Sequence, residues 1–232
     1  MTASANQKGL ASPVRRTLWS LCSQYANLAL NIISGLVLIP FYLKSIDVPT
    51  YGAWLATGEI LAWLTMVDPG LGSSVQQRVG LAFGANERDR TGAYAAAGLV
   101  AMTALGVVVS LMGIVLSTRA ISWLRIPETV SQAALTNAFL VAVAGTFLTL
   151  LAYGPGSVCA GLQRVKWLGI LNVSATIIGM ATTVVMLLRG AGLMALALGS
   201  VARGICHLAG CTSILVYSLR ECEIRLKFRR WA

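Results

Sequence analysis

The chain has 232 residues, of which 56% are hydrophobic and only 11% are charged, and its mean hydropathy is +0.75. Soluble domains are about 25% charged, so this composition excludes a soluble globular protein. The formal net charge of +10 indicates charged cytoplasmic loops first and a site for anionic ligands only second. Because helices satisfy their backbone amides internally in hydrocarbon, we predict an all-α, polytopic membrane protein.

Six apolar runs are each long enough to cross a bilayer, which takes about 20 residues. A polar segment, Met1–Val14, precedes them and is predicted to be a disordered cytoplasmic N-terminus. The runs cover about 17–43, 51–80 with an interruption at Pro69-Gly70, 91–117, 131–154, 167–188 and 192–219. Residues 15–219 therefore form one six-helix transmembrane lobe. Residues 220–232 form a basic cytoplasmic tail or the start of a linker into further helices.

The loop charges predict the orientation of these helices. With six crossings, thirteen Lys and Arg residues fall on one side of the membrane and four on the other, while Arg203 lies inside the last helix. Cytoplasmic loops carry the excess of Lys and Arg. Both termini are therefore predicted to be cytoplasmic, and an odd number of helices would remove this segregation.

The first helix carries a polar stripe, because five polar residues recur at intervals of three and four. They are Ser20, Gln24, Asn27, Asn31 and Ser34. At 3.6 residues per turn these side chains share one face, which cannot face lipid without cost. The stripe makes hydrogen bonds to other helices or lines a hydrated cavity, and the sequence leaves both open.

Charged residues inside the predicted helices are the strongest candidates for function. Arg203 lies roughly 16 Å from the start of the last helix at ~1.5 Å per residue, near the membrane midplane, and His207 follows one turn later. Arg203 forms a structural ion pair or binds an anionic substrate. Glu59 lies at a similar depth in the second helix, so we expect it to face the same interior space. Asp68 begins the Asp-Pro-Gly-Leu-Gly helix break.

Other classes of function find little support in the sequence. The five cysteines form no CxxC pair, so neither a zinc site nor a disulfide framework is indicated, and no cofactor is implied. One histidine and no carboxylate cluster argue against a membrane enzyme. Nucleic-acid binding is excluded because the basic residues lie at the membrane flanks.

Short motifs in a fixed order resemble a known family. They are Tyr51-Gly52-Ala53-Trp54, Asp68-Pro69-Gly70-Leu71-Gly72, Gln76-Gln77-Arg78, Ala82-Phe83-Gly84 with the charged loop Glu87–Arg90, Gly161-Leu162-Gln163-Arg164, and Gly190-Ala191-Gly192-Leu193. In this respect the chain resembles the amino-terminal half of a polysaccharide or O-antigen flippase of the multidrug/oligosaccharidyl-lipid/polysaccharide exporter superfamily. The resemblance covers about 15–217, nearly the whole chain.

The resemblance implies a fold and a mechanism. Members have two six-helix lobes that rock around a central cavity in the inner membrane, and they move an undecaprenyl-pyrophosphate-linked oligosaccharide between leaflets. Only one lobe is present, so a truncated record, a missing second lobe or a homodimer partner is expected.

The resemblance also suggests roles for individual residues. Arg203 and Arg78 would bind the pyrophosphate, and the cavity would be lined by Gln24, Asn27, Asn31 and His207. Glu59 and Asp68 would couple transport to an ion gradient. A multidrug or metabolite cation-coupled antiporter of the same superfamily and a non-transporting membrane subunit are the alternatives.

Overall fold

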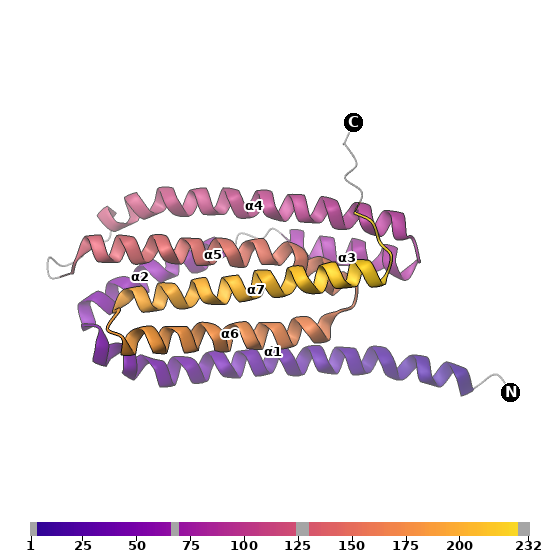
Figure 1. The fold of residues 1–232 in the computed structure, drawn as a ribbon, viewed down its shortest axis with the longest axis horizontal. Coiled ribbons are helices and arrows are strands. Elements are labelled where there is room, and N and C mark those ends of the chain that lie inside the picture. Colours follow the sequence, from indigo (N-terminus) through magenta and orange to yellow (C-terminus); the bar gives the residue numbers. More distant parts are fainter. Residues whose placement is uncertain (1–3, 66–69, 124–129, 227–232) are drawn as a thin grey trace.

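A computed structural model describes residues 4–65, 70–123 and 130–226. Within these residues the chain forms seven helices and no strand (Figure 1). The helices are α1 (Ser4–Ser45), α2 (Val48–Thr65), α3 (Leu71–Gly84), α4 (Arg88–Trp123), α5 (Gln132–Gly161), α6 (Val165–Leu188) and α7 (Leu193–Glu221).

Five long helices lie side by side in the order α4, α5, α7, α6, α1, and the shorter helices α2 and α3 lie behind α4 and α5 (Figure 1). The turn that joins α1 to α2 and the turn that joins α6 to α7 lie at one end of this bundle, here called the Asp47 end. The turns α3–α4 and α5–α6 lie at the opposite end with the end of α7, here called the Arg88 end (Figure 1).

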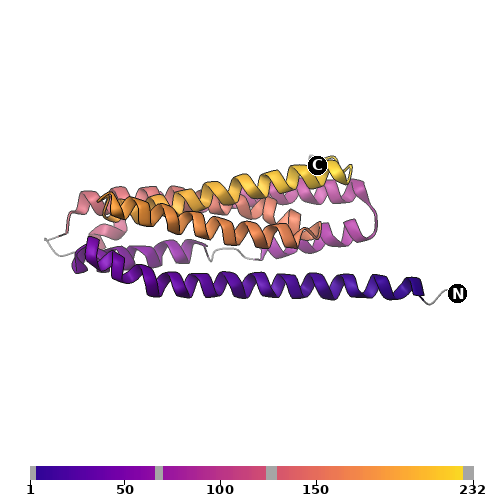
Figure 2. The same cartoon turned by 60° about the horizontal axis from the view of Figure 1, so that its bottom comes forward.

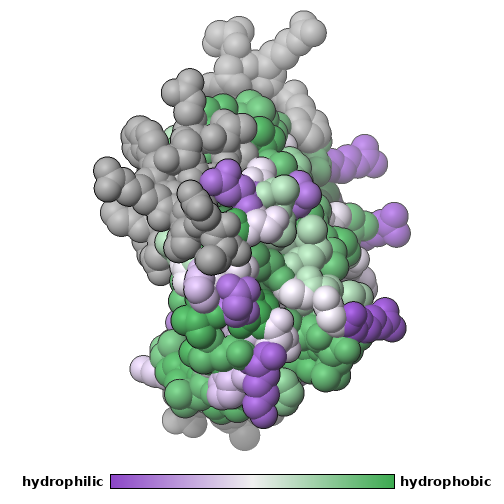
Figure 3. Space-filling model, turned by 90° about the vertical axis from the view of Figure 1, so that its left-hand side faces the viewer, coloured by the Kyte–Doolittle hydropathy of each residue, from purple (hydrophilic) through white to green (hydrophobic). Residues whose placement is uncertain are grey.

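Five helices of the described chain are long and apolar enough to cross a membrane: α4 to α7 and residues 24–45 of α1. Figure 3 looks onto the Asp47 end, where hydrophobic residues occupy most of the coloured surface and hydrophilic side chains are scattered among them. These findings confirm an all-helical, polytopic membrane protein. The sixth predicted crossing is divided between α2, with 18 residues, and α3, with 14, so the count of six stays a prediction.

The divided helix agrees with the break that the Pro-Gly pair predicts. Asp68 and Pro69 lie outside the described residues. Gly70 caps α3 with a φ of 82°, a left-handed conformation that glycine adopts without steric cost. The chain therefore turns at Gly70 before it resumes a helix at Leu71.

Two helices extend beyond the ranges expected from the sequence. Helix α1 begins at Ser4, before the expected start near residue 17, and its first part extends beyond the other helices (Figures 1 and 2). The segment is polar, yet its Ala, Gln, Lys and Leu residues are good helix formers. The fourth predicted helix was expected to end at Gly154, but α5 continues through the buried Pro155 to Gly161. Neighbouring helices can satisfy the carbonyl that such a proline frees.

Apolar side chains form clusters at the two ends of the bundle, whereas glycines bring two helices close together in its middle. A cluster at the Asp47 end joins Ile46 to apolar residues of α5, α6 and α7, and a cluster at the Arg88 end joins Val79 and Ala95 to residues of α5 and α7. Between them α5 and α7 approach closely at Gly145 and Gly204. A Cβ atom at Gly204 would lie 2.7 Å from the carbonyl oxygen of Gly145. Small residues permit such contact between membrane helices.

Asp47 caps α2, and its removal should lower the melting temperature at neutral pH. Thr50 donates to Asp47 Oδ2 from its hydroxyl at 2.8 Å and from its backbone amide at 3.1 Å. These bonds, the hydroxyl bond first, lower the pKa of Asp47 below 3.8. The stabilisation is therefore present above about pH 3.8 and is lost as the pH falls through the lower pKa of the folded state.

Thermal unfolding of Asp47→Ala in detergent between pH 7 and pH 3 measures this contribution. We expect the difference in melting temperature between Asp47→Ala and the wild-type protein to become smaller as the pH falls toward 3. Thr50→Val is the matched control, because it removes the hydroxyl donor but keeps the amide donor. Its melting temperature should therefore fall less than that of Asp47→Ala. A difference in melting temperature that grows as the pH falls would contradict the capping role of Asp47.

Candidate functional site

Arg203 is the charged residue most deeply placed in the membrane-spanning helices of the described chain. Every other Lys, Arg, Asp or Glu of the five spans lies in the first or last turn of its span. Arg203 is the eleventh residue of α7, and its side chain is exposed on the bundle surface. None of the described carboxylates forms an ion pair with it. An exposed guanidinium at this depth needs water or an anion, because hydrocarbon cannot solvate it.

Gly179 of α6 makes room for Arg203. A Cβ atom at Gly179 would lie 3.0 Å from the Cβ atom of Arg203 and 3.0 Å from the carbonyl oxygen of Gly199. Any larger residue at position 179 would push the stem of the arginine away from α6. Gly179 therefore serves the packing of α6 on α7.

His207 lies one turn after Arg203 and contacts α5. Its ring meets the ring of Tyr153 edge to face, with centroids 6.4 Å apart and an interplanar angle of 80°. Both residues are half-buried. Aromatic rings prefer such an arrangement over a stacked one. The side of α7 between its contacts with α5 and α6 thus presents a guanidinium and an imidazole, with a phenol beside the imidazole.

The polar stripe of α1 is used in part for packing. Thr176 of α6 donates to Asn27 Oδ1 at 3.2 Å, and this bond joins the two helices. Asn31 is exposed and donates to the carbonyl oxygen of Asn27, one turn earlier in the same helix, at 2.9 Å. Gln24 is exposed as well. Hydrogen bonding between helices therefore explains Asn27, and the side chains of Gln24 and Asn31 are exposed on the surface of α1.

Arg78 lies apart from this group. It belongs to α3, is exposed, and its guanidinium carbon lies 6.0 Å from the ring centroid of Tyr94 on α4. Helix α3 packs on α4 and α5, and its backbone does not approach that of α6 or α7 closely in the described chain. The structure thus does not bring Arg78 into contact with the helix of Arg203, and a joint role in one anion site stays a prediction.

The side chains of the two predicted coupling carboxylates lie outside the described part of the chain. Glu59 belongs to α2, whose contacts with α5 and α7 are described, but its side chain lies outside the described residues. Asp68 also lies outside them. A shared interior space for Glu59 and Arg203 therefore stays a prediction. Among the described residues, no group of three or more His, Cys, Asp or Glu side chains could hold a metal ion.

A family model for MatE matches residues 28–185, more than half of the chain. The chain belongs to the MatE family. Comparison with curated proteins and with solved structures found no match in either set. MatE proteins are membrane exporters, not enzymes, and they belong to the superfamily that the motifs suggested. The chain is thus a multi-pass membrane protein of a transporter family.

The matched range includes some candidate residues and excludes others. Asn31, Glu59, Asp68 and Arg78 lie inside the MatE match. Gln24 and Asn27 precede it, and Arg203 and His207 follow it. The candidate role of Arg203 and His207 therefore rests on their position in the bundle and on the side chains around them.

Some residues near this group have no strong signal in the sequence. Tyr153 is one of several aromatic residues in apolar helices, and nothing in its spacing indicates His207 as its neighbour. Likewise, nothing in the sequence indicates that Thr176 of α6 donates a hydrogen bond to Asn27 of α1.

Proposed function

We propose that this MatE chain is one lobe of an exporter that translocates an anionic, undecaprenyl-pyrophosphate-linked oligosaccharide across the cytoplasmic membrane. The supporting observation is Arg203, an exposed cation at mid-membrane depth with no ion-pair partner among the described carboxylates. Arginine binds phosphate groups through two parallel hydrogen bonds. His207 and Tyr153 would add donors beside it.

A bound anion accounts for Arg203 better than an ion pair with any of the described carboxylates does. A charged side chain at the centre of a membrane helix costs about 2.5–3.5 kcal/mol on insertion scales. An ion pair with a neighbouring carboxylate would offset that cost, but the described carboxylates all lie near the ends of the bundle. A phosphate group would supply the missing negative charge during transport.

The arrangement of the turns supports a cytoplasmic location for both termini. The turns α3–α4 and α5–α6 and the end of α7 lie at the Arg88 end with the start of α1 (Figure 1). These are the segments to which the sequence assigns most of the Lys and Arg residues, and such loops face the cytoplasm. We propose that the Arg88 end is cytoplasmic and that the membrane is the inner membrane.

A cation-coupled multidrug or metabolite antiporter is the second candidate. It is favoured by Glu59, a carboxylate carried by a helix that packs on α5 and α7. Carboxylates within membrane segments often bind cations or relay protons. In that case Glu59 and Asp68 would carry the transported charge.

Binding to the full chain in lipid nanodiscs separates the two candidates. One probe is a short-chain polyprenyl-pyrophosphate-linked N-acetylglucosamine, and the other is the lipophilic cation tetraphenylphosphonium. We expect saturable binding of the pyrophosphate probe, which the same prenyl alcohol without phosphate does not displace. Binding of the cation alone, and its loss in Glu59→Gln, would overturn the flippase proposal in favour of the antiporter.

A further inference from the structure

The last residue of α7, Glu221, and the five residues after it lie over two neighbouring turns. This segment, Glu221–Leu226, is called the α7 strap. Helix α7 ends with backbone bonds from the Glu223 amide to the Arg220 carbonyl at 3.2 Å and from the Ile224 amide to the Leu219 carbonyl at 3.0 Å. Glu223 has a φ of 54°, a conformation that is uncommon outside glycine. This conformation reverses the direction of the chain, so that the side chains of Glu221 and Glu223 contact different residues.

The two glutamates of the strap bind arginines of two different turns. Glu221 pairs with Arg164 of the α5–α6 turn at 2.5 Å, and Glu223 pairs with Arg88, the first residue of α4, at 2.7 Å. The side chains of Arg88 and Glu223 are 56% and 77% exposed, so salt can screen this pair. The strap thus links the α3–α4 turn to the α5–α6 turn.

An apolar contact and a close backbone approach fix the strap on α4. Ile224 is 6% exposed and packs in the cluster of Val79, Ala95 and Leu162. A Cβ atom at Gly92 would overlap the carbonyl oxygen of Arg225. Only glycine at position 92 therefore lets the strap lie against α4 in this way.

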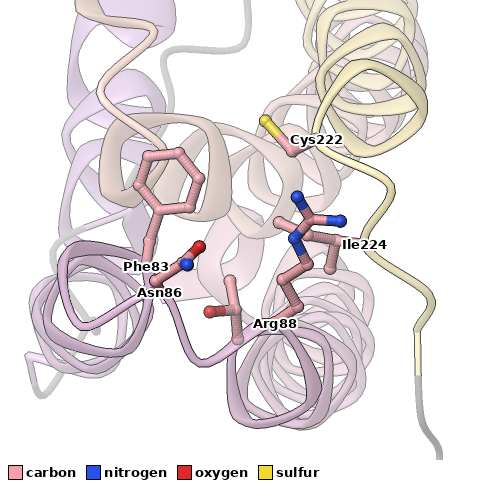
Figure 4. A pocket seen from close by; sticks show the side chains of 6 residues that line it. Phe83, Asn86, Arg88, Cys222 and Ile224 are labelled. Carbon is pink, nitrogen blue, oxygen red and sulfur yellow. The ribbon is translucent and has the colours of Figure 1, made fainter.

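The contact between strap and turn is incomplete. A pocket of about 250 Å³ remains between them, lined by Phe83, Asn86, Arg88, Thr91, Cys222 and Ile224. Figure 4 shows the Arg88 side chain and Ile224 on one side of this space and Phe83 on the other. Unlike the tightly packed middle of the bundle, this end has room for the strap to move.

We propose that the α7 strap is a conformational latch, which holds the α3–α4 turn against the end of α7 and releases it when the strap lifts. Helix α3 is the second part of the divided helix and ends at Gly84, at this turn. Release would free the α3–α4 turn to move relative to the end of α7, while α3 stays packed on α4 and α5. The strap would then control the position of the α3–α4 turn. This proposal does not depend on the identity of the transported molecule.

A matched pair of glycine substitutions tests the latch. Gly92 and Gly84 flank the same turn, but a Cβ atom at Gly84 would meet nothing within 4 Å. Alanine is the better helix former, so both substitutions should slow local opening if the strap has no role. We expect Gly92→Ala to raise the hydrogen-exchange rates of the amides of residues 84–92 at least tenfold in nanodiscs. Gly84→Ala should leave them unchanged or lower them.

A second variant removes one ion pair without a steric change. Glu223→Gln should raise exchange in the same turn at low salt, and this effect should shrink at 0.5 M salt, where the wild-type pair is itself screened. Glu87→Gln is its control, because Glu87 pairs with Arg90 in the same turn and not with the strap. Unchanged exchange over 84–92 in both Gly92→Ala and Glu223→Gln would overturn the latch.

Discussion

Replacing Gly204 with alanine should destabilise the chain by about 1–3 kcal/mol, the usual cost of adding a methyl group to a packed core. The new Cβ atom would lie 2.7 Å from the carbonyl oxygen of Gly145 and 2.9 Å from the Cβ atom of Leu148. Both contacts are on α5, and one of them is backbone, so the helices must separate to relieve the overlap. Valine at the same position should cost more.

The control for this prediction is Gly35→Ala in α1. A Cβ atom at Gly35 would meet nothing within 4 Å, so alanine there should be neutral or stabilise the helix by up to ~1 kcal/mol. Thermal unfolding of both variants in one detergent gives the comparison. Equal melting temperatures for Gly204→Ala and Gly35→Ala would show that the close approach of α5 and α7 is wrong.

The sequence predicted the long helices well because a long apolar run is a strong signal for a membrane helix. The structure places α6 and α7 within a few residues of the predicted ranges. Predictions failed where a local rule depends on context. Helix α1 begins at Ser4, before the expected start near residue 17, and α5 continues past the expected end at Gly154 to Gly161.

For the candidate site, the sequence predicts only those features that follow from counting residues along a single helix. Arg203 and His207 could be placed on one face of α7 by counting residues. The contacts of His207 with Tyr153, and of Asn27 with Thr176, depend on which helices are neighbours. Spacing within one helix carries no such information. For the same reason the ion pairs of Glu221 and Glu223 had no signal, since they form between turns that are far apart in the chain.

Replacing Arg203 with alanine should weaken binding of the pyrophosphate probe about 10- to 150-fold, if the proposed function is correct. Hydrogen bonds to charged groups contribute about 1.5–3 kcal/mol, which corresponds to that range of dissociation constants. Arg203→Lys should give an intermediate affinity, because a lysine keeps the charge but lacks the planar pair of donors. Equilibrium binding in nanodiscs, measured for the three proteins side by side, checks this order.

The stability of the same variants separates a binding role from a structural one. Arg203 has no ion-pair partner among the described carboxylates, so its removal should leave the melting temperature unchanged or raise it. Arg189, exposed at the end of α6, is the matched control, and Arg189→Ala should bind the probe as wild type does. A melting temperature that falls in Arg203→Ala, together with recovery in a Glu59→Gln double variant, would instead reveal a structural ion pair. Wild-type affinity in Arg203→Ala would remove the observation on which the proposed substrate depends.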